Sequence, residues 1–332
     1  MKLSRLFCLA SPLLLAYCLF ALPLLAEEKP VVISTIPPLN SLTAAVAGDA
    51  VRCISLLPPG KSPHDYALSP LDLANLSQAR AWFTIGLPLE KPLRERLAAR
   101  PQLRIVDAAA GIARIPMAGD ADDKHDDKHD DKDDGHDEHE HHDAHDGHDA
   151  HDQHDEHEGH HAHHHHHHGD DGMDPHLWLD PVRARALVKN VAAGLSEICP
   201  ERAAAFRANA AKLDQELAAL DQGLAAALAP LKGKKIIVYH PAFGYFCARY
   251  GLTQLPIELD GRAPSAAWMA KVISVAKREN IKTLFVQPQF NAGSARNAAA
   301  AIGGKVVEFD PLPADYLGYL RSLPARLTGA NL

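Results

Sequence analysis

Three histidines of this chain occupy similar sites: His64, His176 and His240 each lie next to a proline, in a loop that follows a predicted strand or precedes a predicted helix. Asp310 holds a comparable place, at the end of an apolar run and directly before a proline. Imidazole nitrogens with at most one carboxylate suit Zn²⁺, whereas Mn²⁺ prefers oxygen ligands. The four side chains are therefore a candidate set of metal ligands.

The positions of these residues strengthen the metal interpretation. A single histidine is more often a structural residue than a ligand. In open parallel α/β sheets, however, the carboxyl ends of the strands face the crevice where ligands bind. Two of the four residues lie in each half of the chain, so we expect them to meet in one cleft and a bound ion to bridge two lobes. Asp310 has an alternative interpretation, because Asp-Pro at a strand end is also ordinary turn chemistry.

Neighbouring residues are expected to support this site. Three polar side chains are candidates to orient an imidazole by hydrogen bonding, namely Asp65, Tyr66 and Gln287. Asp174 is interpreted as a turn residue, and Asp180, which precedes a proline, as a helix cap. Trp178 and Trp268 are expected to pack in the core or between the lobes.

The remaining histidines are concentrated in residues 120–171, which contain 19 His, 21 Asp or Glu, 3 Lys and no apolar residue larger than Ala. Ordering a backbone costs about 1–2 kcal/mol per residue, and this segment has no apolar surface to bury in return, so a disordered loop is predicted. Interleaved imidazoles and carboxylates offer many weak, interchangeable Zn²⁺ sites. The alternative is a solvated acidic linker, although a spacer has no need of so many imidazoles. The run 163–168 lies mid-chain within this tract and is not interpreted as a purification tag.

The charge of the chain is divided between two parts. The formal net charge is −8, but residues 120–171 carry −18 and the rest of the chain +10. Without Lys2 and Arg5 the folded body carries about +8. Neither part shows the basic and aromatic stripe of a nucleic-acid groove, so no nucleic-acid partner is expected.

Residues 1–26 have the features of a cleaved secretory signal peptide: Lys2 and Arg5 precede an apolar run over 6–25, and a small residue, Ala26, ends it. We therefore expect the mature protein in the periplasm. Attachment as a lipoprotein through Cys18 is the less favoured alternative, because Tyr17 stands where a small residue is required.

The cysteines do not suggest a zinc knuckle. Cleavage leaves Cys53, Cys199 and Cys247, and none of them belongs to a CxxC pair. Export permits one disulfide among the three, with the pairing left open.

Apolar runs alternate with helical patterns along the chain, which predicts an α/β fold with parallel sheets. We expect an N-terminal lobe over 27–199, a linking helix over 200–232 and a C-terminal lobe over 233–332. Strands are predicted at 31–35, 51–57, 81–86, 103–107, 235–239, 252–259, 283–286 and 305–309. Besides the linking helix, helices are predicted at 39–47, 71–80, 90–100, 182–198, 242–250, 264–280, 294–302 and 316–327.

Four segments carry a resemblance to a known family, and they read PPGKSPHDY at 58–66, DPHLWLDP at 174–181, YHPAF at 239–243 and FDPL at 309–312. In this order they resemble the motifs of the bacterial zinc receptors that feed ABC importers. The resemblance spans nearly the whole mature chain, and it includes a His-rich insertion between the first two motifs. It implies two α/β lobes, each with a mainly parallel sheet, joined by one long rigid helix with a single metal ion between them.

When the ligands of this family are assigned motif by motif, the resemblance implies that the zinc ligands are His64, His176 and His240. The fourth position is then filled by Asp310 or a water. Some zinc receptors have an acidic residue where this chain has Pro63, and relatives usually have Glu-Pro where it has Gln287-Pro288. Manganese receptors of the related class use a set richer in carboxylates, with an acid in place of His240.

The implied function is capture of Zn²⁺ outside the cytoplasmic membrane and delivery to the permease of an ABC importer with a cytoplasmic ATPase. The protein is expected to be a monomer and not an enzyme. Its His-rich loop is expected to collect zinc weakly or to accept it from a periplasmic zinc chaperone. Because imidazoles must be neutral to bind, affinity should fall as the pH drops through about 6.5.

Two other functions are weighed against this one. A zinc buffer or adhesin would bind the same ion with no permease partner. A hydrolase with three histidines and a zinc-bound water would need a general base, and the sequence has no HExxH or HxHxD-like cluster.

Overall fold

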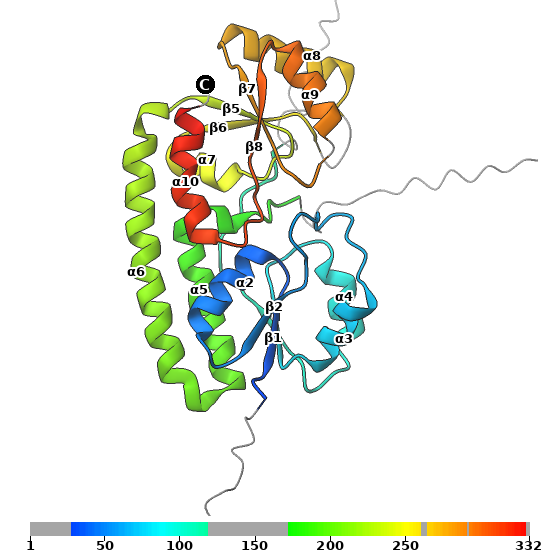
Figure 1. The fold of residues 1–332 in the computed structure, drawn as a ribbon, viewed down its shortest axis with the longest axis vertical. Helices are drawn as coiled ribbons and strands as arrows, with labels where there is room; N and C mark the ends of the chain where they lie inside the picture. The colour runs from blue at the N-terminus through cyan, green and yellow to red at the C-terminus, as the bar shows by residue number, and fades with distance from the viewer. Residues whose placement is uncertain (1–27, 119–171, 260–263, 291, 330–332) are drawn as a thin grey trace, which may run out of the picture.

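The computed structural model describes residues 28–118, 172–259, 264–290 and 292–329. The predicted signal peptide and the whole His-rich loop, residues 120–171, lie outside the described residues. Figure 1 shows two lobes stacked along the long axis of the molecule, with one long helix along their side. The predicted fold class is therefore confirmed.

The N-terminal lobe is built on four parallel strands, β1 (Val31–Ser34), β2 (Arg52–Ser55), β3 (Ala81–Thr84) and β4 (Arg104–Asp107). Their order in the sheet is β2-β1-β3-β4. The sheet is accompanied by α2 (Pro37–Ala47), α3 (Pro70–Gln78) and α4 (Glu90–Leu97). Every residue of β3 is buried, as expected for a central strand covered on both faces.

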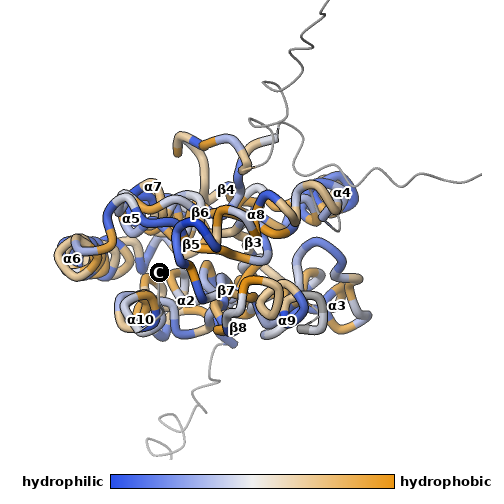
Figure 2. Tube along the Cα trace, turned by 90° about the horizontal axis from the view of Figure 1, so that it is seen from above, coloured by the Kyte–Doolittle hydropathy of each residue, from blue (hydrophilic) through white to orange (hydrophobic). Residues whose placement is uncertain are grey.

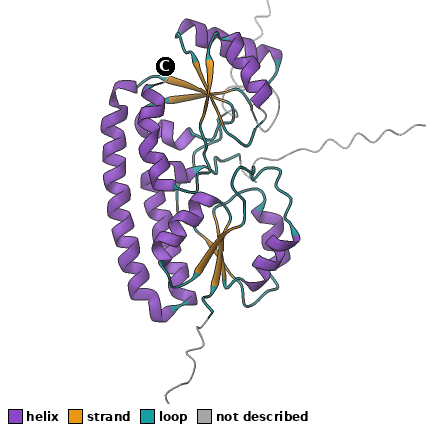
Figure 3. Cartoon of the chain, viewed as in Figure 1, coloured by secondary structure: helices purple, strands orange, loops and turns teal. Residues whose placement is uncertain are grey.

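The C-terminal lobe repeats this arrangement with β5 (Lys235–Val238), β6 (Thr253–Pro256), β7 (Thr283–Val286) and β8 (Lys305–Glu308). All of its strand pairs are parallel, in the order β6-β5-β7-β8. Its helices are α7 (Gly244–Tyr250), α8 (Ala266–Arg278), α9 (Ala292–Ala301) and α10 (Tyr316–Thr328). Figure 3 shows each sheet flanked by helices.

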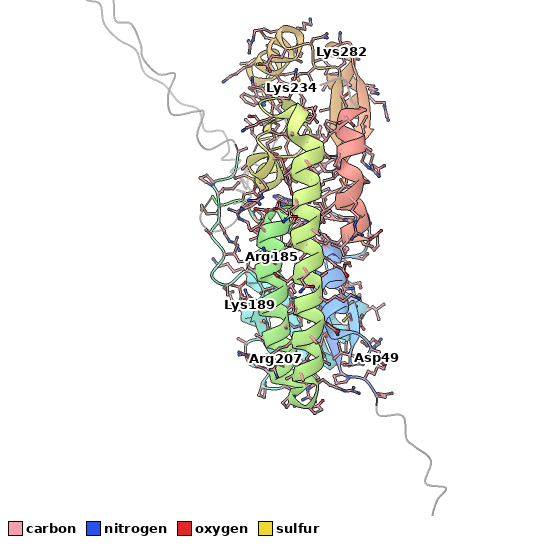
Figure 4. The ribbon with its side chains drawn as sticks, turned by 90° about the vertical axis from the view of Figure 1, so that its left-hand side faces the viewer. Asp49, Arg185, Lys189, Arg207, Lys234 and Lys282 are labelled. Atoms are coloured by element: carbon pink, nitrogen blue, oxygen red, sulfur yellow. The ribbon has the colours of Figure 1, made fainter. Side chains whose placement is uncertain are left out.

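Two packed helices lie beside the N-terminal sheet, and the second of them reaches the C-terminal lobe. The first, α5 (Pro181–Ile198), starts at Asp180, whose side chain accepts from the backbone N–H of Val182 and so acts as the predicted cap. The second, α6 (Ala203–Leu228), has 26 residues, is extended at both ends by 3-10 turns and follows the side of both lobes. Figure 4 shows α6 lying between α5 and α10.

A shared apolar core holds the lobes together. One cluster of buried residues joins the inner face of the N-terminal sheet, α5 and α6 to α7, α10 and the inner face of the C-terminal sheet. Two smaller clusters cover the outer faces. Seen from above in Figure 2, α5, α6 and α10 lie on one flank, and α3 and α4 lie on the opposite flank.

Several element boundaries differ from prediction. Helix α2 begins at Pro37 rather than residue 39, because a proline fits the first turn of a helix. Helix α4 ends at Leu97 rather than 100, and β2 and β6 are shorter than their apolar runs. Cys53, Cys199 and Cys247 are all free in the structure. Within the described residues, no helix combines the length and the apolar character needed to cross a membrane.

Candidate metal centre

The fold brings the three predicted histidines together. His64, His176 and His240 each offer a ligand atom, and these atoms all lie within 4.8 Å of one another. The ring of His240 lies 5.0 Å from that of His64 and 5.3 Å from that of His176, measured between centroids. His176 and His240 are each only 3% exposed, and His64 is half-buried. Such a cluster can hold a metal ion.

Each histidine is held by a loop at the cleft side of its lobe. The loop after β2 turns at Gly60, whose φ of 76° favours glycine, and carries His64 next to the buried Pro63. His176 directly precedes the 3-10 turn Leu177–Leu179. His240 lies just beyond the carboxyl end of β5. The prediction that a cleft between the sheets gathers these side chains is consistent with this arrangement.

Two buried carboxylates contact the imidazoles. Asp174 Oδ1 accepts from the backbone N–H of His176 and lies 2.8 Å from its Nδ1. Glu258 Oε1 lies 3.3 Å from Nδ1 of His240. A carboxylate at Nδ1 stabilises the proton there and directs Nε2 toward a metal. From the sequence, Asp174 is predicted only as a turn residue, and no role is predicted for Glu258.

The backbone around His240 is fixed by Gln287, which was predicted to orient an imidazole. Gln287 Oε1 accepts from the backbone N–H of His240 at 3.1 Å, and its Nε2 donates to the carbonyl of His240 at 2.8 Å. Phe290 stacks on the His240 ring at 5.2 Å. Of the other two candidates, Tyr66 donates to Asp72 at 2.7 Å, and Asp65 is exposed.

Asp310 follows β8 at the predicted place, but it does not belong to the cluster of grouped ligand atoms. Its Oδ1 accepts from Nε2 of Gln289 at 2.8 Å and from the backbone N–H of Leu312 at 2.9 Å. These contacts tie Asp310 to neighbouring loops of the C-terminal lobe.

The histidines line a small cavity of about 20 Å³. Its other lining residues come from both lobes: Ser62, Pro63, Trp178, Gln289, Phe290, Pro311 and Leu312. A space of this size accommodates a single ion or water and excludes small organic molecules.

The loop that carries His176 is anchored to the C-terminal lobe. Trp178 Nε1 donates to the carbonyl of Pro311 at 2.7 Å, and the Tyr316 hydroxyl donates to the carbonyl of Trp178 at 2.6 Å. The Tyr245 hydroxyl donates to the carbonyl of Asp174 at 2.7 Å. The loop that carries His176 is therefore held in place by the C-terminal lobe. Trp178 has the packing role predicted for it and also borders the cavity.

Comparisons with known proteins agree with this geometry. The family model described as "Zinc-uptake complex component A periplasmic" matches residues 32–330. The chain is 40% identical over 293 residues to the high-affinity zinc uptake system protein ZnuA of Paracoccus denitrificans, which covers 86% of this chain and 83% of that protein. It is 28% identical over 299 residues to the zinc-binding protein AdcA of Streptococcus pyogenes, where the match covers 87% of this chain.

The chain spans about half, 51%, of the length of AdcA. Among solved structures, a crystal structure of ZnuA superposes with a TM-score of 0.73 at 30% identity, covering 92% of this chain and 100% of that one. A zinc-bound deletion mutant of ZnuA gives the same TM-score, 0.73, and 30% identity. Because this family model matches residues 32–330, the chain belongs to the ZnuA family of periplasmic zinc-uptake components.

Proposed function

We propose that this protein captures Zn²⁺ outside the cytoplasmic membrane and delivers it to the permease of an ABC importer powered by a cytoplasmic ATPase. The observation that carries the proposal is the cluster of His64, His176 and His240 between two lobes, in which His176 and His240 are buried and His64 is half-buried. Family membership and the names of the relatives support zinc as the cargo. The predicted signal peptide supports a periplasmic location.

The three histidines are proposed to bind the ion through one nitrogen each. Zn–N bonds of about 2.0–2.1 Å place tetrahedral ligands about 3.4 Å apart, so rings whose ligand atoms lie within 4.8 Å need to move by only about 1 Å or less. A donor set of three imidazoles favours Zn²⁺ over Mn²⁺. The fourth position is left to Asp310 or to a water.

The surroundings of the site support binding without catalysis. Asp174 and Glu258 both lie against an Nδ1 of a proposed ligand, as orienting partners do. In these positions neither carboxylate serves as a general base for a bound water. The receptor is proposed to act as a monomer. Its His-rich loop supplies further weak Zn²⁺ sites and receives zinc from solution or from a periplasmic zinc chaperone.

Competitive zinc titration against a chelator tests this function. Four forms of the mature protein are compared: the intact chain, a form lacking residues 120–171, a triple alanine variant of His64, His176 and His240, and a control with His163, His164 and His165 changed to alanine. The loop-deleted form and the control should keep one tight zinc, and the triple variant should lose it. A tight zinc retained by the triple variant would show that the cleft is not the site.

A second experiment separates import from buffering or adhesion. In a strain that lacks the gene, growth should fail only in zinc-poor medium, and the intact gene should restore both growth and ⁶⁵Zn uptake. The triple histidine variant should restore neither. If uptake of ⁶⁵Zn is unchanged by loss of the gene, the importer role is wrong and a buffer or adhesin is favoured.

A further inference from the structure

Gln289 presents a buried acceptor beside the three histidines. It lies in the segment that follows β7 and lines the same cavity as His64, His176 and His240. Its carbonyl oxygen Oε1 is buried and has no hydrogen-bond partner among the described residues. Buried acceptors in folded proteins nearly always have a partner, and leaving one unpaired is costly. A donor that the described residues do not supply is therefore expected at this oxygen.

The orientation of the Gln289 amide follows from its other contact. Nε2 donates to Oδ1 of Asp310 at 2.8 Å, and an ionised carboxylate can only accept. The amide nitrogen must therefore face Asp310, which directs Oε1 away from it. Asp310 is itself held by the backbone N–H of Leu312 at 2.9 Å. Asp310 thus fixes which way the amide of Gln289 points.

The segment around Gln289 is also held against the histidines. The backbone N–H of Phe290 donates to the carbonyl of Gln287 at 3.1 Å, and the Phe290 ring stacks on His240 at 5.2 Å. Gln287 in turn binds the backbone of His240 on both its N–H and C=O. The unpaired oxygen therefore belongs to a rigid part of the cavity wall.

We infer that Gln289 is a positioning residue for the fourth coordination position: its Oε1 accepts a hydrogen bond from the water that completes the coordination of the ion. Asp310 then acts through Gln289 and is not a ligand. This inference rests on the proposed function. A zinc site with three protein ligands keeps its fourth position for water, and such a water is a strong donor that needs a buried acceptor.

Two substitutions distinguish this arrangement from ligation by Asp310. Gln289→Leu removes the acceptor at similar volume and should weaken zinc binding about 10- to 100-fold, the usual cost of losing a partner of a metal-bound group. Asp310→Asn keeps an oxygen that can accept hydrogen bonds from Gln289 and Leu312. The loss of zinc affinity in this variant should therefore be smaller, below about tenfold. Direct ligation by Asp310 predicts the reverse order.

The measurement is chelator competition with zinc on the loop-deleted protein, together with the visible spectrum of the Co²⁺-loaded protein and thermal unfolding without metal. The Co²⁺ spectrum should change in Gln289→Leu and not in Asp310→Asn. Gln289→Leu removes the unpaired acceptor and also the hydrogen bond from Nε2 to Asp310, so the unfolding temperature of the metal-free protein should fall by only about 2–4 °C. A misfolded variant would lose the cooperative unfolding transition, and this separates loss of structure from loss of the water contact.

Two results would overturn the inference: wild-type zinc affinity in Gln289→Leu, or a greater loss in Asp310→Asn than in Gln289→Leu. Failure of the proposed function looks different, since the triple variant of His64, His176 and His240 would then keep its tight zinc. If that triple variant loses zinc while Gln289→Leu does not, the histidine site stands and the role of Gln289 is wrong.

Discussion

Replacing the carboxylates behind the ligand imidazoles by amides should weaken zinc binding without disturbing the fold. Asp174→Asn and Glu258→Gln keep the size and an oxygen acceptor of each side chain but remove its negative charge. The charge stabilises the Nδ1 proton and makes the opposite nitrogen a stronger metal ligand. The loss should therefore appear in affinity and not in the number of tight sites.

The two contacts predict different magnitudes. Asp174 Oδ1 meets His176 twice, at the backbone N–H and at Nδ1, both at 2.8 Å. Glu258 meets His240 once, at 3.3 Å. Changes to such partners typically cost 10- to 100-fold in metal affinity, or about 1.4–2.7 kcal/mol. We expect Asp174→Asn near the upper end of this range and Glu258→Gln near the lower end.

Chelator competition on the loop-deleted protein measures these losses of affinity without interference from the weak zinc sites of the His-rich loop. Glu197→Gln is a matched control, because Glu197 is an exposed carboxylate paired with Arg104 far along α5. It should bind zinc as the parent does. If Asp174→Asn and Glu258→Gln bind as tightly as this control, the carboxylates do not tune the histidines, and the argument from the Nδ1 contacts is wrong.

Four further outcomes are expected for stability. The hydrogen bond from Arg249 lowers the pKa of Asp221, so the ionised carboxylate stabilises the fold above its ordinary pKa of about 3.9, and this stabilisation is lost as the pH falls through the lowered value. Asp221→Asn should therefore cost on the order of 1 kcal/mol in urea unfolding at pH 7 and less at pH 3. Gly194→Ala should destabilise by up to about 2 kcal/mol, because a Cβ would lie 2.9 Å from side chains of β3 and β4, and overpacking outweighs the gain in helix propensity. Gly223→Ala, with open space around the position, should stabilise α6 by about 0.5–1 kcal/mol in the same assay. Free zinc at 100 times its Kd should stabilise the loop-deleted protein by about 2.7 kcal/mol in thermal unfolding, and a chelator should reverse this.

Each of these has a contradicting result. A penalty for Asp221→Asn that is as large at pH 3 as at pH 7 would exclude the ion pair as its source. Equal effects of alanine at Gly194 and Gly223 would contradict the close packing of α5 on the N-terminal sheet. Zinc stabilisation that survives the triple histidine substitution would place the tight ion elsewhere.

Much of the fold could be predicted from the alternation of apolar runs with helical patterns, which requires parallel strands with helical connections. The ends of the strands could not. Val51 and Leu57 are buried, as their type predicts, but they lie outside the paired part of β2. Burial and strand pairing are separate properties, and only burial is visible in residue type. The strand order also depends on how helices cover the sheets, which a linear pattern does not contain.

Residues of the candidate site could be predicted where the residue type and its immediate neighbours were sufficient evidence. An isolated histidine beside a proline at a strand end is visible in sequence, and the structure brings His64, His176 and His240 together. Their partners were less visible. Asp174 does make the predicted turn contact, and the same oxygen also reaches the ring of His176.

Other contacts depend on strand neighbours. Glu258 reaches His240 because β6 lies beside β5, and Gln289 meets Asp310 because β7 lies beside β8. Glu258 lies inside the predicted strand 252–259, so nothing in the sequence set it apart. Gln289 follows the predicted strand 283–286, and this position beyond a strand was the signal used for Gln287 but not for Gln289.

The most direct test of the account is X-ray diffraction from zinc-loaded, loop-deleted crystals on both sides of the zinc absorption edge. The account predicts one strong anomalous peak in the cavity, within bonding distance of a nitrogen of His64, of His176 and of His240. A strongest peak anywhere else, or one bound by fewer than these three imidazoles, would contradict it.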